Sequence, residues 1–194
     1  MNENFIILGS PLAGGSGYYK SGLVYAWKRT SNGTSTSSPW NIYEQDTNQG
    51  GLYGRASESN ENNYSGGNRF GNSVSISENN YVAISTKSDQ NQYIPNNVLH
   101  GVEYGNVYIY ILDETGFNFV TYLSPPPGKT KKYFGRKALQ LSYDSSTETT
   151  FLLVSGKNSS NKIEYYLYKS KSPYDWQFYK EVTYPSGTNI TSHP

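Results

Sequence analysis

The segment that best indicates the fold class is RFGNSVSISENNYVAIST at residues 69–86, which is followed after a gap by GNVYIYILDETGFNFVTY at residues 105–122. It consists of short runs of β-branched and aromatic residues, and Gly, Asn, Ser and Pro interrupt such runs throughout the chain, as is typical of strands joined by turns. No window of eleven residues carries apolar side chains at helical spacing without such breaks. We therefore predict an all-β protein.

The same pattern recurs along the chain as four kinds of segment, here called A to D, always in the same order. The A segments are RFGNSVSIS (69–77) and YFGRKALQLS (133–142), and the B segments are FIILGS (5–10), YVAIST (81–86) and FLLVSG (151–156). The C segments are GLVYAW (22–27), GNVYIYIL (105–112) and IEYYLYKS (163–170), and the D segments are PWNIYEQ (39–45), GFNFVTY (116–122) and DWQFYKE (175–181). Links such as SENN (77–80) are short enough for hairpins, so each unit is predicted to be a four-stranded antiparallel meander.

The repeat divides the chain into three expected units, because the pairs Phe70-Gly71 and Phe134-Gly135 lie 64 residues apart. Residues 1–50 form an incomplete first unit that has segments B to D and lacks segment A. Residues 51–128 form the second unit, with a long insertion at 45–68 before its first strand. Residues 129–194 form the third unit and the C-terminal tail.

Strand 107–111 indicates how the sheets are covered. Val107, Ile109 and Ile111 alternate with Tyr108 and Tyr110, so both faces carry large and mostly apolar groups. Sheets packed face to face around an axis bury both faces in this way. We predict a β-propeller-like array of four-stranded antiparallel blades, about three repeats of which the first is incomplete.

The Phe-Gly pairs carry a family resemblance. With the strands that follow them, they resemble the FG-GAP repeat of integrin-α-like β-propellers. Gly9-Ser10-Pro11 approximates the Gly-Ala-Pro element of that repeat, whereas Ser85-Thr86-Lys87 and Ser155-Gly156-Lys157 depart from it. The resemblance implies a propeller that uses its B–C and D–A connections as a binding face.

Two departures from that family change the expectation. Integrin-type repeats often hold calcium between the first two strands, but SENN (77–80) and YDSSTE (143–148) lack the ligand spacing of a calcium loop, so we expect no metal. The chain also has fewer blades than the four to eight of typical propellers. Either the chain is a piece of a longer polypeptide, or several copies complete a ring, or the blades stack in an open assembly against partner proteins. We therefore predict that it is not a free monomer and that its partners are other protein subunits or further copies of itself.

Composition excludes several other functions. The net charge of +1 and the charged fraction of 16% argue against a nucleic-acid partner. There is no cysteine, so disulfides and thiolate metal sites are excluded. No signal peptide is visible, and no stretch is apolar enough to insert into a membrane. Localisation stays open, with the cell surface and a virion as the two settings considered.

The glycine-rich opening, LGSPLAGGSGYYKSGLVY (8–25), is not a phosphate loop. Tyr19 stands where that motif needs Gly before Lys20, and a strand follows in place of a helix. No Ser-His-Asp set can be assigned, and the carboxylates lie at strand ends and turns, so we expect no catalytic residue, no cofactor and no enzyme activity. An enzyme would need a carboxylate pair that meets across the central channel.

Loop length points to one binding face. The insertions Gln45–Asn68 and Lys87–Tyr104 share that face with the opening loop and with Ser124–Lys132. The candidate binding residues on these loops are Tyr18, Tyr19, Lys20, Tyr93, His100 and Glu103.

The aromatic residues that start the D segments, Trp40, Phe117 and Trp176, recur in register and are expected to pack between blades. We therefore expect a non-enzymatic module for protein–protein contact, in surface adhesion or in an assembly such as a virion. The alternative is a lectin-like propeller whose loop tyrosines stack on glycans. The identity of the partner and the number of blades in a complete ring stay open.

Overall fold

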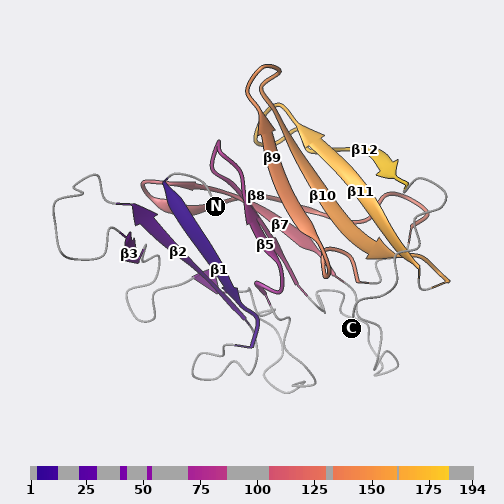
Figure 1. Cartoon of the computed structure of the whole chain (residues 1–194), viewed down its shortest axis with the longest axis horizontal. Coiled ribbons are helices and arrows are strands. Elements are labelled where there is room, and N and C mark those ends of the chain that lie inside the picture. Colours follow the sequence, from indigo (N-terminus) through magenta and orange to yellow (C-terminus); the bar gives the residue numbers. More distant parts are fainter. Residues whose placement is uncertain are drawn as a thin grey trace.

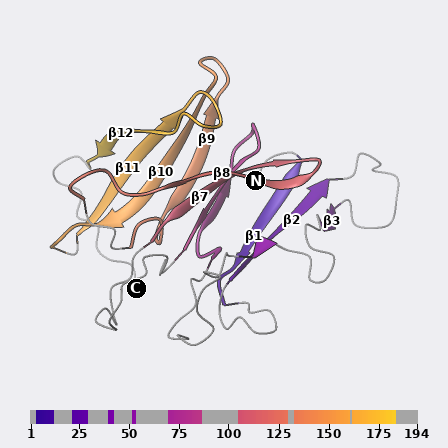
Figure 2. The same cartoon turned by 180° about the vertical axis from the view of Figure 1, so that it is seen from behind.

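The computed structural model describes residues 4–12, 22–29, 40–42, 52–53, 70–86, 105–129, 133–160 and 162–183, with residues 40–42 and 52–53 described by their backbone. Every regular element in these residues is a β-strand, which confirms the all-β prediction. The strands form three four-stranded sheets that lie side by side in chain order (Figure 1), and Figure 2 shows them from behind. Within the described ranges, no helix is long and apolar enough to cross a membrane.

Sheet 1 contains β1 (Phe5–Ser10), β2 (Leu23–Arg29), β3 (Trp40–Ile42) and β4 (Leu52–Tyr53). Strand β2 pairs with β1 along one edge and with both β3 and β4 along the other. Strand β4 lies inside the predicted insertion 45–68 and was not expected from the sequence. No described strand pairs with the other edge of β1.

Sheets 2 and 3 are complete four-stranded antiparallel meanders, as predicted. Sheet 2 contains β5 (Val74–Ile76), β6 (Tyr81–Ser85), β7 (Val107–Asp113) and β8 (Gly116–Leu123). Sheet 3 contains β9 (Leu139–Asp144), β10 (Thr149–Lys157), β11 (Ile163–Ser170) and β12 (Gln177–Val182). The SENN segment turns β5 into β6, and Asn80 adopts a φ of 66° there, a conformation that Asn tolerates better than most residues.

Two apolar clusters hold the sheets together, and sheet 2 contributes to both. Val107 and Ile109 belong to the cluster shared with sheet 3, whereas Tyr110 and Leu112 belong to the cluster shared with sheet 1. Both faces of β7 are therefore covered, as the alternation along this strand predicted. In the described part of the chain the three sheets form an open array.

The Phe-Gly pairs join each sheet to the sheet before it. Phe134 is buried in sheet 3, where its ring lies 6.1 Å from that of Tyr166 and 6.2 Å from that of Tyr168. Gly135 has a φ of 74°, which side chains rarely adopt, and a Cβ there would lie 2.7 Å from Val107 Cγ2 in sheet 2. Only glycine combines this turn with so close an approach.

The first Phe-Gly pair repeats this arrangement between sheets 1 and 2. Gly71 has a φ of 82°, and a Cβ there would lie 2.6 Å from the carbonyl oxygen of Leu23 and 3.0 Å from Val24 Cγ2. The ring of Phe70 lies 5.8 Å from that of Tyr108. Both joints between sheets are thus built from the same parts.

The aromatic starts of the D segments pack between sheets where their side chains are described. Phe117 is buried in the cluster that joins sheets 1 and 2. Trp176 packs on the other cluster, with its ring 5.6 Å from that of Tyr81 in an edge-on arrangement. The predicted packing role is confirmed for these two residues as packing between sheets, and the side chain of Trp40 lies outside the described part.

Candidate functional site

All six predicted binding residues lie outside the described residues, namely Tyr18, Tyr19, Lys20, Tyr93, His100 and Glu103. Most of the two long insertions lies outside them as well. The binding face that the loop lengths indicated therefore stays a prediction.

The turn between β9 and β10, where integrin-type repeats place calcium, is closed by hydrogen bonds within the chain. The carboxylate of Asp144 accepts hydrogen bonds from the hydroxyl of Ser146 at 2.7 Å and from that of Thr147 at 2.8 Å. These bonds hold the pKa of Asp144 below its ordinary value, because they stabilise the charged form. Among the described residues, no group of three or more His, Cys, Asp or Glu side chains is placed to hold a metal ion.

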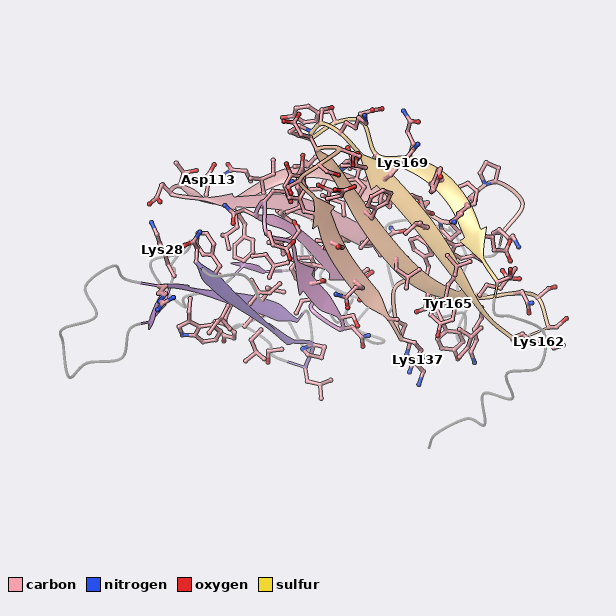
Figure 3. The ribbon with its side chains drawn as sticks, turned by 45° about the horizontal axis from the view of Figure 1, so that its top comes forward. Lys28, Asp113, Lys137, Lys162, Tyr165 and Lys169 are labelled. Carbon is pink, nitrogen blue, oxygen red and sulfur yellow. The ribbon has the colours of Figure 1, made fainter. Side chains whose placement is uncertain are left out.

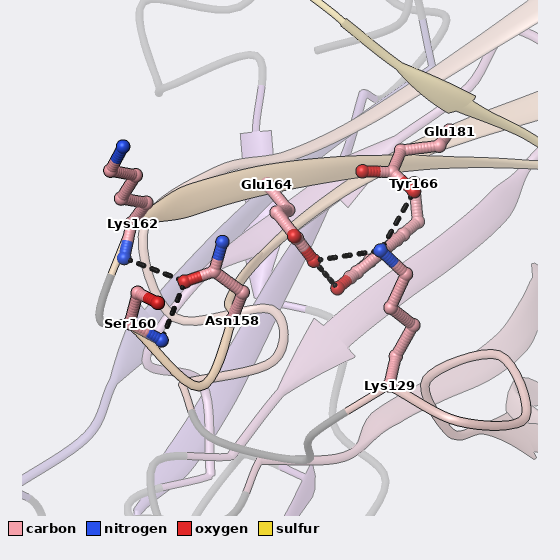
Figure 4. Close-up of polar contacts among 7 residues, drawn as sticks. All are labelled: Lys129, Asn158, Ser160, Lys162, Glu164, Tyr166 and Glu181. Atoms are coloured by element: carbon pink, nitrogen blue, oxygen red, sulfur yellow. Dashed lines mark hydrogen bonds and ion pairs between the residues drawn. The ribbon is translucent and has the colours of Figure 1, made fainter.

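A cluster of charged side chains ties the segment after β8 to sheet 3 (Figure 4). Lys129 Nζ lies 2.8 Å from Glu181 Oε2 and 3.3 Å from Glu164 Oε2. The hydroxyl of Tyr166 donates a hydrogen bond to Glu164 Oε2 at 2.6 Å. The cluster thus joins the connection between sheets 2 and 3 to strands β11 and β12.

The protonation states of Glu164 and Lys129 in this cluster fit a structural role. Burial opposes the charge on Glu164, but hydrogen bonds from Tyr166, Asn158 and Lys129 outweigh it and lower the pKa of Glu164. The hydrogen bond to Glu181 raises the pKa of Lys129. Both groups are therefore charged at neutral pH, and Glu164 is not tuned as a proton donor.

The outer face of sheet 1 is apolar and lacks a described neighbour. We define it by Ile6, Leu8, Tyr25 and Trp27, which share one side of the β1–β2 ladder. The side chain of Leu8 is 55% exposed and the other three are partly exposed. The rings of Tyr25 and Trp27 lie 6.0 Å apart.

The outer face of sheet 3 is also apolar. We define it by Phe151, Leu153, Tyr165 and Leu167, which alternate with the buried residues of β10 and β11 and are each partly exposed. Figure 3 labels Tyr165 and Lys169 toward the two ends of β11.

An open pocket of about 400 Å³ lies at one end of this face, with Phe151, Lys169 and Tyr179 among its lining residues. Lys169 Nζ lies 4.4 Å from the centre of the Tyr179 ring. The ammonium group of Lys169 therefore lies over the aromatic ring of Tyr179 in the lining of the pocket.

The sequence reasoning missed both outer faces because it sought binding residues in loops. The signal was present in the repeat itself. Leu8 takes the register position of Ile84 in sheet 2 and Val154 in sheet 3, and both of these are fully buried. Aligning the three B segments and asking which sheet has no neighbour would have identified both surfaces.

Comparison with known proteins adds no relative. No family model matches the chain, and no curated protein sequence matches it. The function is therefore argued from the sheets and their surfaces.

Proposed function

We propose that the chain is a non-enzymatic interaction module, a β-propeller-like array of the FG-GAP type, that binds other protein subunits through its outer sheet faces. The observation that carries this proposal is the exposure of apolar side chains at repeat positions that are buried elsewhere in the same chain. Contiguous exposed apolar surface on a soluble domain marks a site of interaction.

Equivalent positions in the three sheets show how much the exposure of these side chains differs. Ile84 and Val154 are fully buried, whereas Leu8 at the same register is 55% exposed. Covering one such side chain stabilises a complex by about 1 to 2 kcal/mol. Each outer face carries four apolar or aromatic residues, so its coverage would favour association.

The way the sheets are added supports the propeller part of the proposal. Sheets 2 and 3 each bring a buried Phe-Gly turn that packs on the preceding sheet. If each further sheet packs on the sheet before it in the same way, a sufficient number of sheets closes a ring. Closed rings usually contain about four to eight sheets. Surface adhesion and a structural role in a particle such as a virion are the settings we propose.

Photo-crosslinking tests the proposed contact surface. Benzoylphenylalanine at Tyr165, on the outer face of sheet 3, is expected to give discrete protein adducts when the chain is expressed with its natural partners. The matched control is the same replacement at Tyr174, which is 83% exposed and lies outside both faces. Equal adduct yields at the two positions, or none at Tyr165, would contradict the proposal.

A glycan array separates this proposal from the lectin alternative. We expect the isolated chain to bind no sugar specifically. Specific binding that is lost on replacing Tyr18 and Tyr19 with Ala would favour the lectin interpretation.

A further inference from the structure

The three sheets can be superimposed by register, which gives every position in one sheet a counterpart in the others. One such position is held by Phe5, Tyr81 and Phe151. Their partners on the neighbouring strand are, in the same order, Lys28, Ile111 and Lys169. Val24, Val107 and Tyr165 occupy another, because they pair with Gly9, Ser85 and Ser155. Sheet 2 packs on the previous sheet with one face and receives the next sheet on the other.

The receiving face follows the same rule at both internal joints. In sheet 1, Phe5 and Val24 belong to the buried cluster that sheet 2 completes. In sheet 2, Tyr81 and Val107 belong to the cluster that sheet 3 completes. Every one of these four residues is less than one tenth exposed.

The outer face of sheet 3 is the third copy of this receiving face. Phe151 stands where Phe5 and Tyr81 stand, and Tyr165 stands where Val24 and Val107 stand, yet both are partly exposed. The open pocket at Phe151 lies where the previous sheet accepts an aromatic residue, since Trp176 packs on Tyr81. Sheet 3 therefore carries a ready-made surface for one more sheet of this kind.

The outer face of sheet 1 is the matching half. Ile6 and Leu8 occupy the register positions of Val82 and Ile84, which pack on the previous sheet and are fully buried. Tyr25 and Trp27 occupy the positions of the aromatic pairs Tyr108–Tyr110 and Tyr166–Tyr168.

The backbone of β3 completes the match. Trp40 pairs with Arg29 as Phe117 pairs with Leu112, so its register position is that of the aromatic residue at each internal joint. Sheets 1 and 3 thus carry the two halves of one type of joint.

We infer that the outer face of sheet 3 in one copy docks onto the outer face of sheet 1 in a second copy, so that chains associate head to tail. This inference rests on the proposed function and names the partner as the chain itself. The two surfaces differ, so the contact is heterologous and leads either to a closed ring or to a filament. Two copies joined at both ends supply six of the described sheets, a number within the range of about four to eight found in closed rings.

The strength of the contact depends on which described strands can take part in it. Strands β5 and β9 lie next to the preceding sheet at the two internal joints, and no described strand holds that place beside β1. With no such strand among the described residues, the joint between copies is expected to bury less surface than the joints within one chain. Association should therefore depend on concentration and be visible by sedimentation.

Two charge substitutions test the docking, one on each face. Leu8→Lys alters the outer face of sheet 1, and Ile163→Lys alters the rim of the outer face of sheet 3, where the side chain is 48% exposed. Each variant alone should associate roughly tenfold or more weakly than the wild type, because docking would bury an unpaired ammonium group. Leu8→Met and Ile163→Met keep the apolar character and serve as controls that should associate normally. Circular dichroism verifies that all four variants are folded.

Mixing the two lysine variants gives the decisive measurement. The Leu8→Lys chain keeps an intact sheet 3 face and the Ile163→Lys chain keeps an intact sheet 1 face. At a concentration where neither variant associates alone, an equimolar mixture should therefore form a one-to-one dimer in sedimentation velocity. Association of either lysine variant by itself as strong as that of the wild type, or no dimer in the mixture, overturns head-to-tail docking.

The proposed function and this inference fail differently. A wild-type chain that stays monomeric at every concentration overturns the inference. If Tyr165 nevertheless crosslinks to a different protein, the interaction module stands with another partner. If Tyr165 crosslinks to nothing, both fail.

Discussion

Replacing Gly135 with Ala should separate the cost of the turn from the cost of the close contact between sheets 2 and 3. The alanine would have to adopt a φ of 74°, and its Cβ would lie 2.7 Å from Val107 Cγ2 and 2.9 Å from Ser85 Cβ. The backbone conformation costs about 1 kcal/mol or more for a residue with a side chain. Overpacking against two atoms that cannot move freely adds about 1 to 3 kcal/mol. We expect the free energy of unfolding to fall by about 3 kcal/mol.

Gly128→Ala is the matched control. Gly128 has a φ of 79°, but a Cβ there would meet no atom within 4 Å. This variant bears the backbone cost alone, so its free energy of unfolding should fall by about 1 kcal/mol. The difference between the two variants then measures the packing of the Phe-Gly turn on sheet 2.

Equilibrium unfolding in urea provides the measurement, with circular dichroism as the probe and comparison of the slopes as the test of two-state behaviour. In a Val107→Ala background one of the two crowded atoms is gone, so Gly135→Ala should cost about 1 kcal/mol less than in the wild type. If Gly135→Ala costs no more than Gly128→Ala, the close contact between the sheets does not constrain this position.

Three further predictions concern charged and ionisable side chains. The pKa of Tyr166 and Tyr168 is raised by burial, so both should stay protonated above their ordinary pKa of about 10. The stability they contribute is present below that pH and lost as the pH rises, and ultraviolet absorbance of tyrosinate should show them ionising together with alkaline unfolding. The pKa of Asp144 is lowered by its hydrogen bonds, so the stability that it contributes is lost as the pH falls through its folded-state pKa. Asp144→Asn should therefore flatten acid unfolding curves, and an unchanged curve would contradict this. The ion pair between Lys28 and Glu114 links sheet 1 to a turn of sheet 2 and involves a carboxylate side chain that is 81% exposed, so Lys28→Ala should cost at most about 1 kcal/mol and nothing measurable at high salt.

The sequence predicted the strands and their pairing because these depend on local patterns. Alternation in 107–111 is a property of one strand, and it indicated correctly that both faces of the sheet are covered. The recurrence of Phe117 and Trp176 in register identified them as packing residues before any distance was known.

The sequence reasoning did not identify contacts that depend on two distant segments. A Cβ on Gly9 would lie 2.0 Å from the carbonyl oxygen of Gly71, and one on Gly105 would lie 2.0 Å from that of Phe134. Nothing near Gly9 in the chain indicates that a backbone from another sheet passes beside it. Strand β4 was missed for the same reason, because two residues carry no periodicity and pair with β2 only in the folded chain.

The position of sheet 2 between two neighbours has a consequence for the order in which the protein opens. Sheets 1 and 3 each share one apolar cluster with another sheet, whereas sheet 2 shares both. Amide hydrogens of β6 and β7 should therefore exchange with solvent more slowly than those of β1 or β12, and unfolding should begin at the two ends of the array. Head-to-tail association would cover the outer faces of sheets 1 and 3 and slow the exchange of their amide hydrogens. The slow exchange expected for sheet 2 would then extend to the whole assembly.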